Sequence, residues 1–312
     1  MMDPSVEGDA DDKSSYFPPF FPSAIEREIF ETAAELYPES IAPLVLVAHR
    51  AHECDHRIER VKYRTVTSSD DTVGRSLCEV HTLRRAIRAN VKPAGFFHER
   101  VRNLFLDCHL DEEGMREVLS ACSGVHSLAL FDVGPSALPS LGLMQPRRLY
   151  AWLTNLFGGI KLVDLSHPMF ARLTHLDLLD EAIADFPWPD FAALPALTHL
   201  SLFQLSSTGV IERVLATCPR LAVLIDMQLS LPVPADRLSV DDPRFVCVAV
   251  TYLNYKSDWV IGTQGGLDFW ARADAFVAKK KRGEIKPTSG VGRREAESWI
   301  RLKTGSGEDG LE

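Results

Sequence analysis

The sequence predicts an α/β fold in which parallel strands stack into a short, irregular solenoid, preceded by a small helical module. An apolar residue recurs every 24 residues, and most units then read apolar-x-x-apolar-x-apolar. The unit openings are Val101, Val125, Leu149, Leu173, Leu197, Leu221 and Phe245. This period and this opening are typical of leucine-rich repeats, in which a single unit buries its apolar face only by stacking against its neighbours.

The segments that return from one strand to the next are of two kinds. Residues 115–119 and 211–215 carry apolar side chains at i, i+3 and i+4, which predicts helical returns. The returns at 135–146 and 186–195 contain several prolines, so turns or short 3₁₀ pieces are expected there. The array is irregular, because two places where leucines would sit and one further apolar place are occupied by other residues. They are Trp152, Thr154 and Asp226.

The N-terminal part of the chain has two sections. Residues 1–15 carry five carboxylates against one lysine, a composition typical of a disordered acidic tail. The small helical module is assigned to residues 16–66. Ser23 and Glu26 form a capping box that opens its first helix, and a second helix follows Ser40.

The segments on either side of the repeats are expected to cap them, because a terminal unit otherwise exposes its apolar edge to water. Residues 67–100 are assigned to a polar linker and a capping helix, in which apolar side chains at 77–87 have helical spacing. The repeats are assigned to 101–255. A C-terminal cap helix at 256–282 is expected to close the far end of the solenoid, and residues 283–312 have the composition of a disordered tail.

Several stretches carry a resemblance to a known family. Residues 21–30 (Phe-Pro-Ser-Ala-Ile-Glu-Arg-Glu-Ile-Phe) resemble the opening of an F-box, 41–50 resemble its second helix, and parts of 58–64 resemble its closing motif. Together with residues 268–274 and the repeats, the resemblance covers most of 20–282. The chain is similar to the F-box-like, leucine-rich-repeat proteins of mushroom-forming (basidiomycete) fungi.

The resemblance implies a function without catalysis. An F-box is a three-helix plug that binds a Skp-type adaptor, so the chain would be a substrate receptor of a Skp/cullin/F-box ubiquitin ligase and would hold a protein target near the enzyme. The adaptor-binding residues that the resemblance implies are Phe21, Pro22, Ile25, Ile29, Phe30, Leu44 and Val47. Ala24, Arg57 and Arg60 depart from the family pattern and support an alternative, a stand-alone leucine-rich-repeat scaffold whose F-box has drifted.

The concave face of the solenoid is the expected target site. Side chains alternate along a strand, so the third, fifth and seventh places of each unit face the inside of the horseshoe. Many of these places are apolar, and a contiguous exposed apolar patch usually marks a partner site. The expected target-binding residues are Phe105, Phe131, Leu153, His175, Asp177, Leu179, His199, Phe203, Ile225 and Met227. The alternative is that a loop or the C-terminal segment folds over this face.

Composition and charge favour a protein of the cytoplasm or the nucleus. A net charge of −9 argues against general nucleic-acid binding, and no run of 18 apolar residues is present to cross a membrane. The start of the chain lacks the features of a signal peptide, and the six cysteines are scattered, which favours a reducing compartment. The basic run at 279–282 is either a nuclear-import signal or a set of cations favoured at a helix C-terminus.

Two groups of histidines offer an enzyme or metal alternative. His175 and His199 lie one repeat apart, but no Gly-x-Ser-x-Gly elbow accompanies them, and Thr-His-Leu recurs there as a repeat consensus. A second group lacks the separated ligand pair that zinc sites normally use. Its members are His49, His52, Cys54 and His56. Phosphate-binding loops and nucleotide fingerprints are absent from the sequence. We therefore predict no catalytic residue, no metal site and no cofactor.

Overall fold

The chain divides into two compact units, Met1–Ile58 and Glu59–Glu312, and each is considered by itself. The structure is a computed structural model. It describes residues 61–68, 78–107, 110–180, 189–205, 207–228, 240–249, 252–285 and 300–301, together with positions 25, 28, 29, 32, 33 and 37. In the first unit, five of these six positions are helical, and the Tyr37 amide donates to the Ala33 carbonyl at 2.8 Å. These residues agree with the predicted first helix of the N-terminal module.

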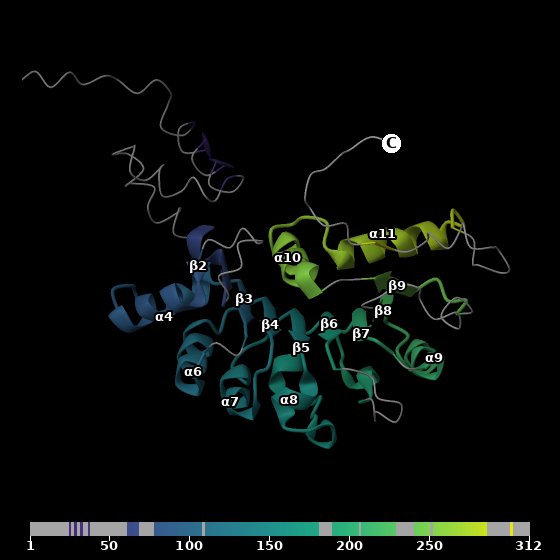
Figure 1. The fold of residues 1–312 in the computed structure, drawn as a ribbon, viewed down its shortest axis with the longest axis horizontal. Helices are drawn as coiled ribbons and strands as arrows, with labels where there is room; N and C mark the ends of the chain where they lie inside the picture. Colours follow the sequence, from purple (N-terminus) through teal and green to yellow (C-terminus); the bar gives the residue numbers. More distant parts are fainter. Residues whose placement is uncertain are drawn as a thin grey trace, which may run out of the picture. The chain divides into compact units, whose positions relative to one another are not determined.

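The second unit is an α/β structure built on one parallel sheet (Figure 1). Among the described residues, ten strands follow the order β10-β9-β8-β7-β6-β5-β4-β3-β1-β2, and from β3 to β9 each strand pairs with the next along the chain. The strands are β1 (Thr65–Thr67), β2 (Cys78–Glu79), β3 (Asn103–Leu106), β4 (Ser127–Leu130), β5 (Arg148–Ala151), β6 (His175–Leu178), β7 (His199–Phe203), β8 (Val223–Gln228), β9 (Phe245–Ala249) and β10 (Ile300–Arg301). The fold class is therefore α/β, and the order of its strands is consistent with a repeat solenoid.

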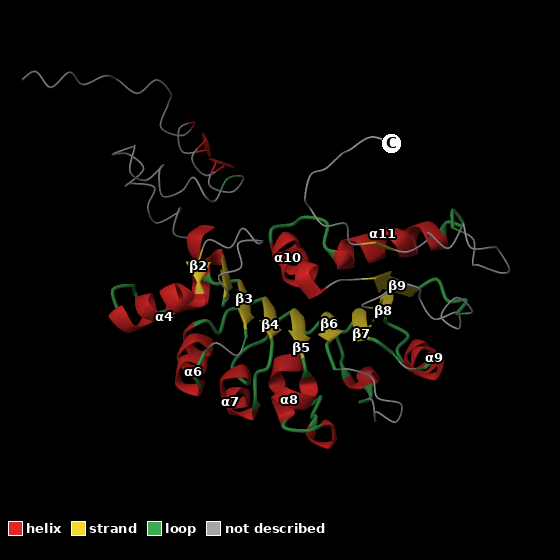
Figure 2. Cartoon of the chain, viewed as in Figure 1, coloured by secondary structure: helices red, strands yellow, loops and turns green. Residues whose placement is uncertain are grey.

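Helical returns cover one side of the sheet, as Figure 2 shows. The α-helices are α4 (Val80–Ala89), α5 (Phe96–Arg100), α6 (Glu112–Ala121), α7 (Leu138–Leu141), α8 (Leu153–Phe157) and α9 (Thr208–Thr217). The 3₁₀ pieces are η2 (Pro135–Ala137), η3 (Ile160–Leu162), η4 (Pro168–Phe170) and η5 (Phe191–Ala193). The two predicted helical returns, α6 and α9, are confirmed, and short pieces stand where prolines were expected to interrupt a helix. None of the helices in the described ranges is long and apolar enough to cross a lipid bilayer.

A column of leucines runs through the core between the sheet and these returns. Its members are paired across neighbouring strands, and each is completely buried. They are Leu104, Leu128, Leu149, Leu176, Leu200 and Leu224. Fully burying a leucine is worth roughly 1.5–3 kcal/mol, so this column is a main source of stability for the stack. Four cysteines of the described chain (Cys78, Cys122, Cys218 and Cys247) are buried in the same core.

The strand register corrects the equal spacing that was expected from the sequence. Leu128 pairs with Leu149, a step of 21 residues, and Leu149 pairs with Leu176, a step of 27. Leu224 pairs with Phe245, again a step of 21. Leu149 and Phe245 are therefore not unit openings and lie three residues further into their units. The short and long steps around Leu149 add up to two periods of 24, which is why the regular spacing of the later openings survives.

The N-terminal end of the sheet begins earlier than the sequence indicated. Strand β1 pairs in parallel with β3, with Thr65 opposite Asn103. Residues at the end of the segment assigned to the helical module thus belong to the sheet. Helix α4 lies in the segment that was assigned to a linker and a capping helix, and its side chains Val80 and Leu83 are completely buried.

Candidate functional site

Two C-terminal helices lie against the inner face of the sheet (Figure 1). They are α10 (Tyr252–Thr263) and α11 (Phe269–Lys281). Their aromatic side chains form a second apolar core with the strand residues that face them. Trp259 and Trp270 are each only 1% exposed, although they lie outside the repeats. The C-terminal helix was expected to close the far end of the solenoid, and that expectation is wrong, because α11 covers the inner face.

Helices α10 and α11 together are called the cover. The cover buries most of the expected target site. Five apolar residues of the proposed target site belong to this second core and are at most 5% exposed. They are Phe105, Leu179, Phe203, Ile225 and Met227. Phe131 is partly buried and stacks on Phe105 with ring centroids 4.8 Å apart. A protein partner cannot reach these side chains while α10 and α11 are in place, so in this structure the concave face is not an open docking surface. The alternative that the C-terminal segment folds over the face is the one observed.

Leu153 was placed on the concave face by the equal-step register, and this placement is wrong. It is 1% exposed and packs in the core between the sheet and the returns. Because β5 is shifted by three residues, Trp152 lies near the inner face instead, where its ring meets Phe131 edge-on at 5.6 Å. The Trp152 indole N–H donates to the Leu179 carbonyl at 2.6 Å.

Polar contacts fix the cover to the sheet at defined points. The Tyr255 hydroxyl on α10 donates to Asp177 on β6. The Trp270 indole N–H on α11 donates to the Tyr150 hydroxyl on β5 at 3.0 Å. Since every one of these four side chains is at most 7% exposed, the contacts form in a nearly water-free interface. Buried hydrogen bonds of this kind select one orientation of the helices, because any other orientation leaves polar groups unpaired.

Ionic contacts join the turn between α10 and α11 to the same sheet. Asp268 caps the start of α11 by accepting from the Ala271 amide at 2.8 Å, and it also pairs with Arg148 on β5 at 3.0 Å. Asp258 on α10 accepts from the Phe269 amide at 2.7 Å. Its other oxygen pairs with Arg272 of α11. The two helices and the central strand are thus tied together around one turn.

Burial raises the pKa of the Asp177 carboxyl to about 7, and the Tyr255 hydrogen bond only partly opposes this effect. Burial, the negative charge of Asp177 and the neighbouring Tyr150 together raise the pKa of Tyr255. Tyr255 therefore stays protonated at neutral pH, and Asp177 keeps its proton to a much higher pH than an ordinary carboxyl group does. An Asp with a raised pKa in a cleft is often a catalytic candidate, but this one is 0% exposed and faces a structural helix.

The two histidines of the expected site form a stacked pair. The rings of His175 and His199 lie 4.0 Å apart and nearly parallel, and each meets the Trp270 ring edge-on. Burial, together with the nearby His199 and Arg148, lowers the pKa of His175 to about 2. His199 Nε2 lies 3.1 Å from an Asp274 oxygen on α11. The two histidines therefore pack against α11 and help to orient it. Their role in this structure is structural, whereas the sequence placed them among the target-binding residues.

The remaining predicted site residues lie in or near the first unit. Ile25 and Ile29 are helical and 46% and 48% exposed, so they present apolar surface in that unit. The other expected adaptor-binding residues and the 49–56 histidine group lie outside the described residues. Within the described ranges, no group of three or more His, Cys, Asp and Glu side chains is placed to hold a metal ion.

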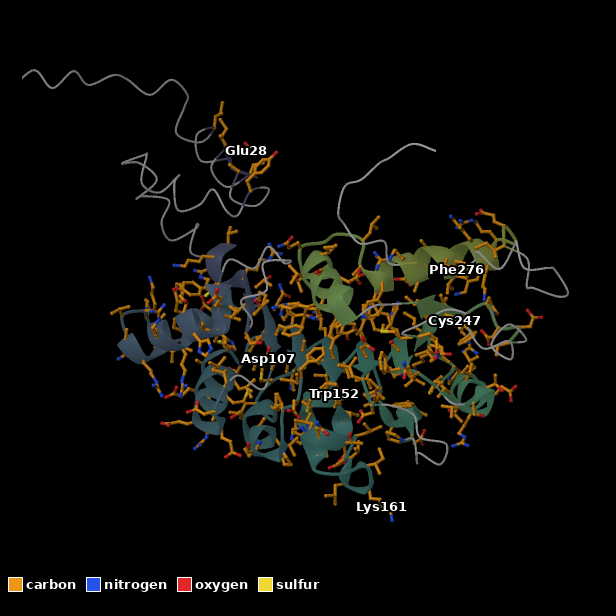
Figure 3. The ribbon with its side chains drawn as sticks, in the orientation of Figure 1. Glu28, Asp107, Trp152, Lys161, Cys247 and Phe276 are labelled. Atoms are coloured by element: carbon orange, nitrogen blue, oxygen red, sulfur yellow. The ribbon has the colours of Figure 1, made fainter. Side chains whose placement is uncertain are left out.

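The basic run after α11 has a local role in the structure. The Lys280 ammonium donates to the Phe245 carbonyl on β9 at 2.8 Å, and burial lowers the pKa of Lys280. Its neighbours Lys279 and Lys281 stand in the last turn of the helix, where the exposed backbone carbonyls stabilise positive charge. Figure 3 shows Phe276 of the same helix on the inner side of the sheet and Lys161 on the outer side.

Helix α10 was missed by the sequence interpretation, which assigned its first residues to the last repeat. A signal was available, because Tyr252, Tyr255 and Trp259 stand at i, i+3 and i+7, the spacing of one helical face. The apolar column on the inner face of the sheet was the second sign, because it is the surface on which the apolar face of α10 packs.

Comparison with known proteins adds no identification. No known protein family has a model that matches the chain, and no curated protein matches it. The structure itself supports an α/β fold with one all-parallel sheet, consistent with a repeat solenoid.

Proposed function

We propose that this chain is a protein-interaction adaptor, a substrate receptor of a Skp/cullin ubiquitin ligase. In this proposal the N-terminal segment holds a Skp-type adaptor and the repeat unit holds the protein target. The observation that carries it is the pairing of two parts: a segment that resembles an F-box, and a parallel sheet whose strands follow one another as in a repeat solenoid. Repeat arrays present extended rigid surfaces to partners, which suits recognition.

The buried inner face directs this proposal to other surfaces of the repeat unit. Because α10 and α11 fill the concave side, the target is assigned to the rims of the sheet or to the outer loops. Loops and strand ends carried on a rigid scaffold are common recognition sites. The receptor role itself needs no catalytic group, since it acts by raising the target's concentration near the ligase.

A titration of purified Skp-type adaptor into the full-length chain tests the adaptor half of the proposal. We expect one-to-one binding with a dissociation constant at or below tens of micromolar. The double variant Ile25→Asp/Ile29→Asp should weaken binding at least tenfold, because it puts charge on an exposed apolar helix surface. Leu162→Asp is the matched control, since Leu162 is 64% exposed but lies in the repeat unit.

A second candidate is a stand-alone scaffold, and departures of the sequence at Ala24, Arg57 and Arg60 favour it. It predicts that the titration shows no adaptor binding at tens of micromolar, while an affinity pull-down from native cytosol still recovers stable partners. Recovery of a Skp-type adaptor and a cullin in the pull-down would favour the receptor instead.

A further inference from the structure

One edge of the sheet carries a row of basic side chains, three arginines and a histidine, which we call the basic edge: Arg64, Arg102, His126 and Arg147. These residues stand at the starts of successive strands and are linked by backbone hydrogen bonds. The Arg102 amide donates to the Arg64 carbonyl at 3.0 Å, the His126 amide to the Arg102 carbonyl at 2.8 Å, and the Arg147 amide to the His126 carbonyl at 2.8 Å. Neighbouring strands lie about 4.8 Å apart, so the row spans roughly 14 Å.

The side chains of the basic edge are accessible to a ligand. Arg64, His126 and Arg147 are exposed, and Arg102 is half-buried, with its guanidinium donating to the Gly124 carbonyl at 2.9 Å. Burial and the positive charges of Arg102 and Arg147 lower the pKa of His126. The two arginines therefore disfavour a charge on His126, and the positive charge of the basic edge comes from its three arginines.

The arginines of the basic edge lack acidic partners of the kind that several other arginines in the described chain have. Arg84 and Arg88 share Glu117, and Arg244 pairs with Asp242. In the part of the chain that the structure describes, no ion pair involves an arginine of the basic edge. The basic edge therefore places three arginines without an acidic partner side by side in a protein with 43 acidic and 34 basic side chains.

We propose that the basic edge is a docking surface for an acidic peptide segment of a partner protein, in extended conformation. An extended chain rises about 3.3 Å per residue, so about five residues cover the row. Arginine guanidinium groups match carboxylates with two parallel hydrogen bonds, which gives direction as well as attraction.

An acidic peptide fits this surface better than a nucleic acid does. Single-stranded nucleic acids bind proteins through aromatic side chains on which bases stack, and no aromatic residue of the described repeat unit is exposed. The net charge of −9 also repels a polyanion at long range, whereas a short peptide interacts mainly with the local row. The proposal goes beyond the proposed function, because it holds whether or not the N-terminal segment binds an adaptor.

Fluorescence anisotropy of the full-length chain with labelled hexaglutamate tests the proposal, with hexaglutamine as the neutral probe. We expect hexaglutamate to bind at low salt, hexaglutamine to bind at least tenfold more weakly, and binding to fall as salt increases. Arg64→Glu/Arg147→Glu should weaken hexaglutamate binding at least tenfold. Arg116→Glu/Arg213→Glu, on exposed positions of α6 and α9, makes the same change in net charge and should weaken it less than twofold.

Three results would overturn the proposal. They are absence of hexaglutamate binding to the unmodified chain, an equal loss in both double variants, and tighter binding of a labelled six-nucleotide single strand with the same dependence on Arg64 and Arg147. Melting temperatures of the variants establish that they fold, and Arg64→Ala/Arg147→Ala replaces the charge-reversed variant if that one does not. Because the adaptor titration depends on Ile25 and Ile29, the two proposals fail independently.

Discussion

At the scale of single residues, the interface between sheet and cover depends on a buried carboxyl group. Asp177 is 0% exposed and meets the Tyr255 hydroxyl, and one of its oxygens has no hydrogen-bond partner in the described chain. A buried carboxyl without full pairing is costly when ionised, so the folded state retains its proton to higher pH than the unfolded chain does.

This raised pKa predicts a pH dependence of stability. Because the pKa of Asp177 is about 7 in the folded state and near 3.8 when unperturbed, its contribution is complete below pH 4 and is lost as pH rises through 7. Asp177→Asn removes this loss. We expect the variant's free energy of unfolding, relative to the unmodified protein, to increase on the order of 2–3 kcal/mol between pH 5 and pH 7.5.

Urea unfolding at the two pH values measures this difference. Glu212→Gln, an exposed carboxylate on α9, is the control and should change little with pH. If the free energies of unfolding of Asp177→Asn and the unmodified protein differed by the same amount at both pH values, Asp177 would be ionised and well solvated in the folded state.

At the scale of elements, the sequence predicted those helices and strands whose pattern lies within one segment of the chain, and it missed features that depend on contacts between segments. Helices α6 and α9 were predictable because their apolar spacing and caps lie within one segment. The shift of β5 was not, because it depends on which residues face the core after neighbouring strands have paired. Trp152 and Thr154 were the visible sign of it, since equal spacing would have placed both where leucines belong.

The candidate site was harder to predict than the fold. Most of the apolar residues that the sequence placed on the inner face do lie there, with Leu153 as the exception, but an apolar column is equally compatible with a partner and with a segment of the same chain. What decides between them is tertiary contact, such as Trp270 with Tyr150 across 120 residues. Spacing within single repeats contains no information on that pairing.

The packing of α10 predicts that replacing the indole side chain of Trp259 will greatly lower the stability of the fold. Trp259 is 1% exposed and meets the rings of Phe105 and Tyr150 edge-on, so Trp259→Ala should lower the free energy of unfolding by about 3–5 kcal/mol. Trp259→Phe should recover most of this loss, because it keeps a ring and removes an N–H without an acceptor in the described chain.

Chemical denaturation of the two Trp259 variants gives these values. Leu267→Ala is the control, since Leu267 is 72% exposed in the turn after α10, and it should change stability by less than about 0.5 kcal/mol. A Trp259→Ala variant as stable as this control would contradict the packing of α10 on the sheet.

At the scale of the whole molecule, the closed inner face decides where recognition takes place. A horseshoe with an open concave side would offer its apolar column to a partner. Here that column and the aromatic side chains of α10 and α11 form one continuous core, which leaves the rims and the outer loops as the surfaces to which we assign a partner. The basic edge is such a rim, and the proposed acidic peptide would be recognised there by charge, because the apolar inner face is already filled.

Amide hydrogen exchange of the full-length chain tests the closed inner face most directly. If α10 and α11 are permanent parts of the fold, their amides should exchange as slowly as those of β6 and β7, and all four should become exposed together in global unfolding. Fast exchange in α10 and α11 alongside protected strands would contradict this account. It would show that the cover opens, and the concave face would then return as the target site.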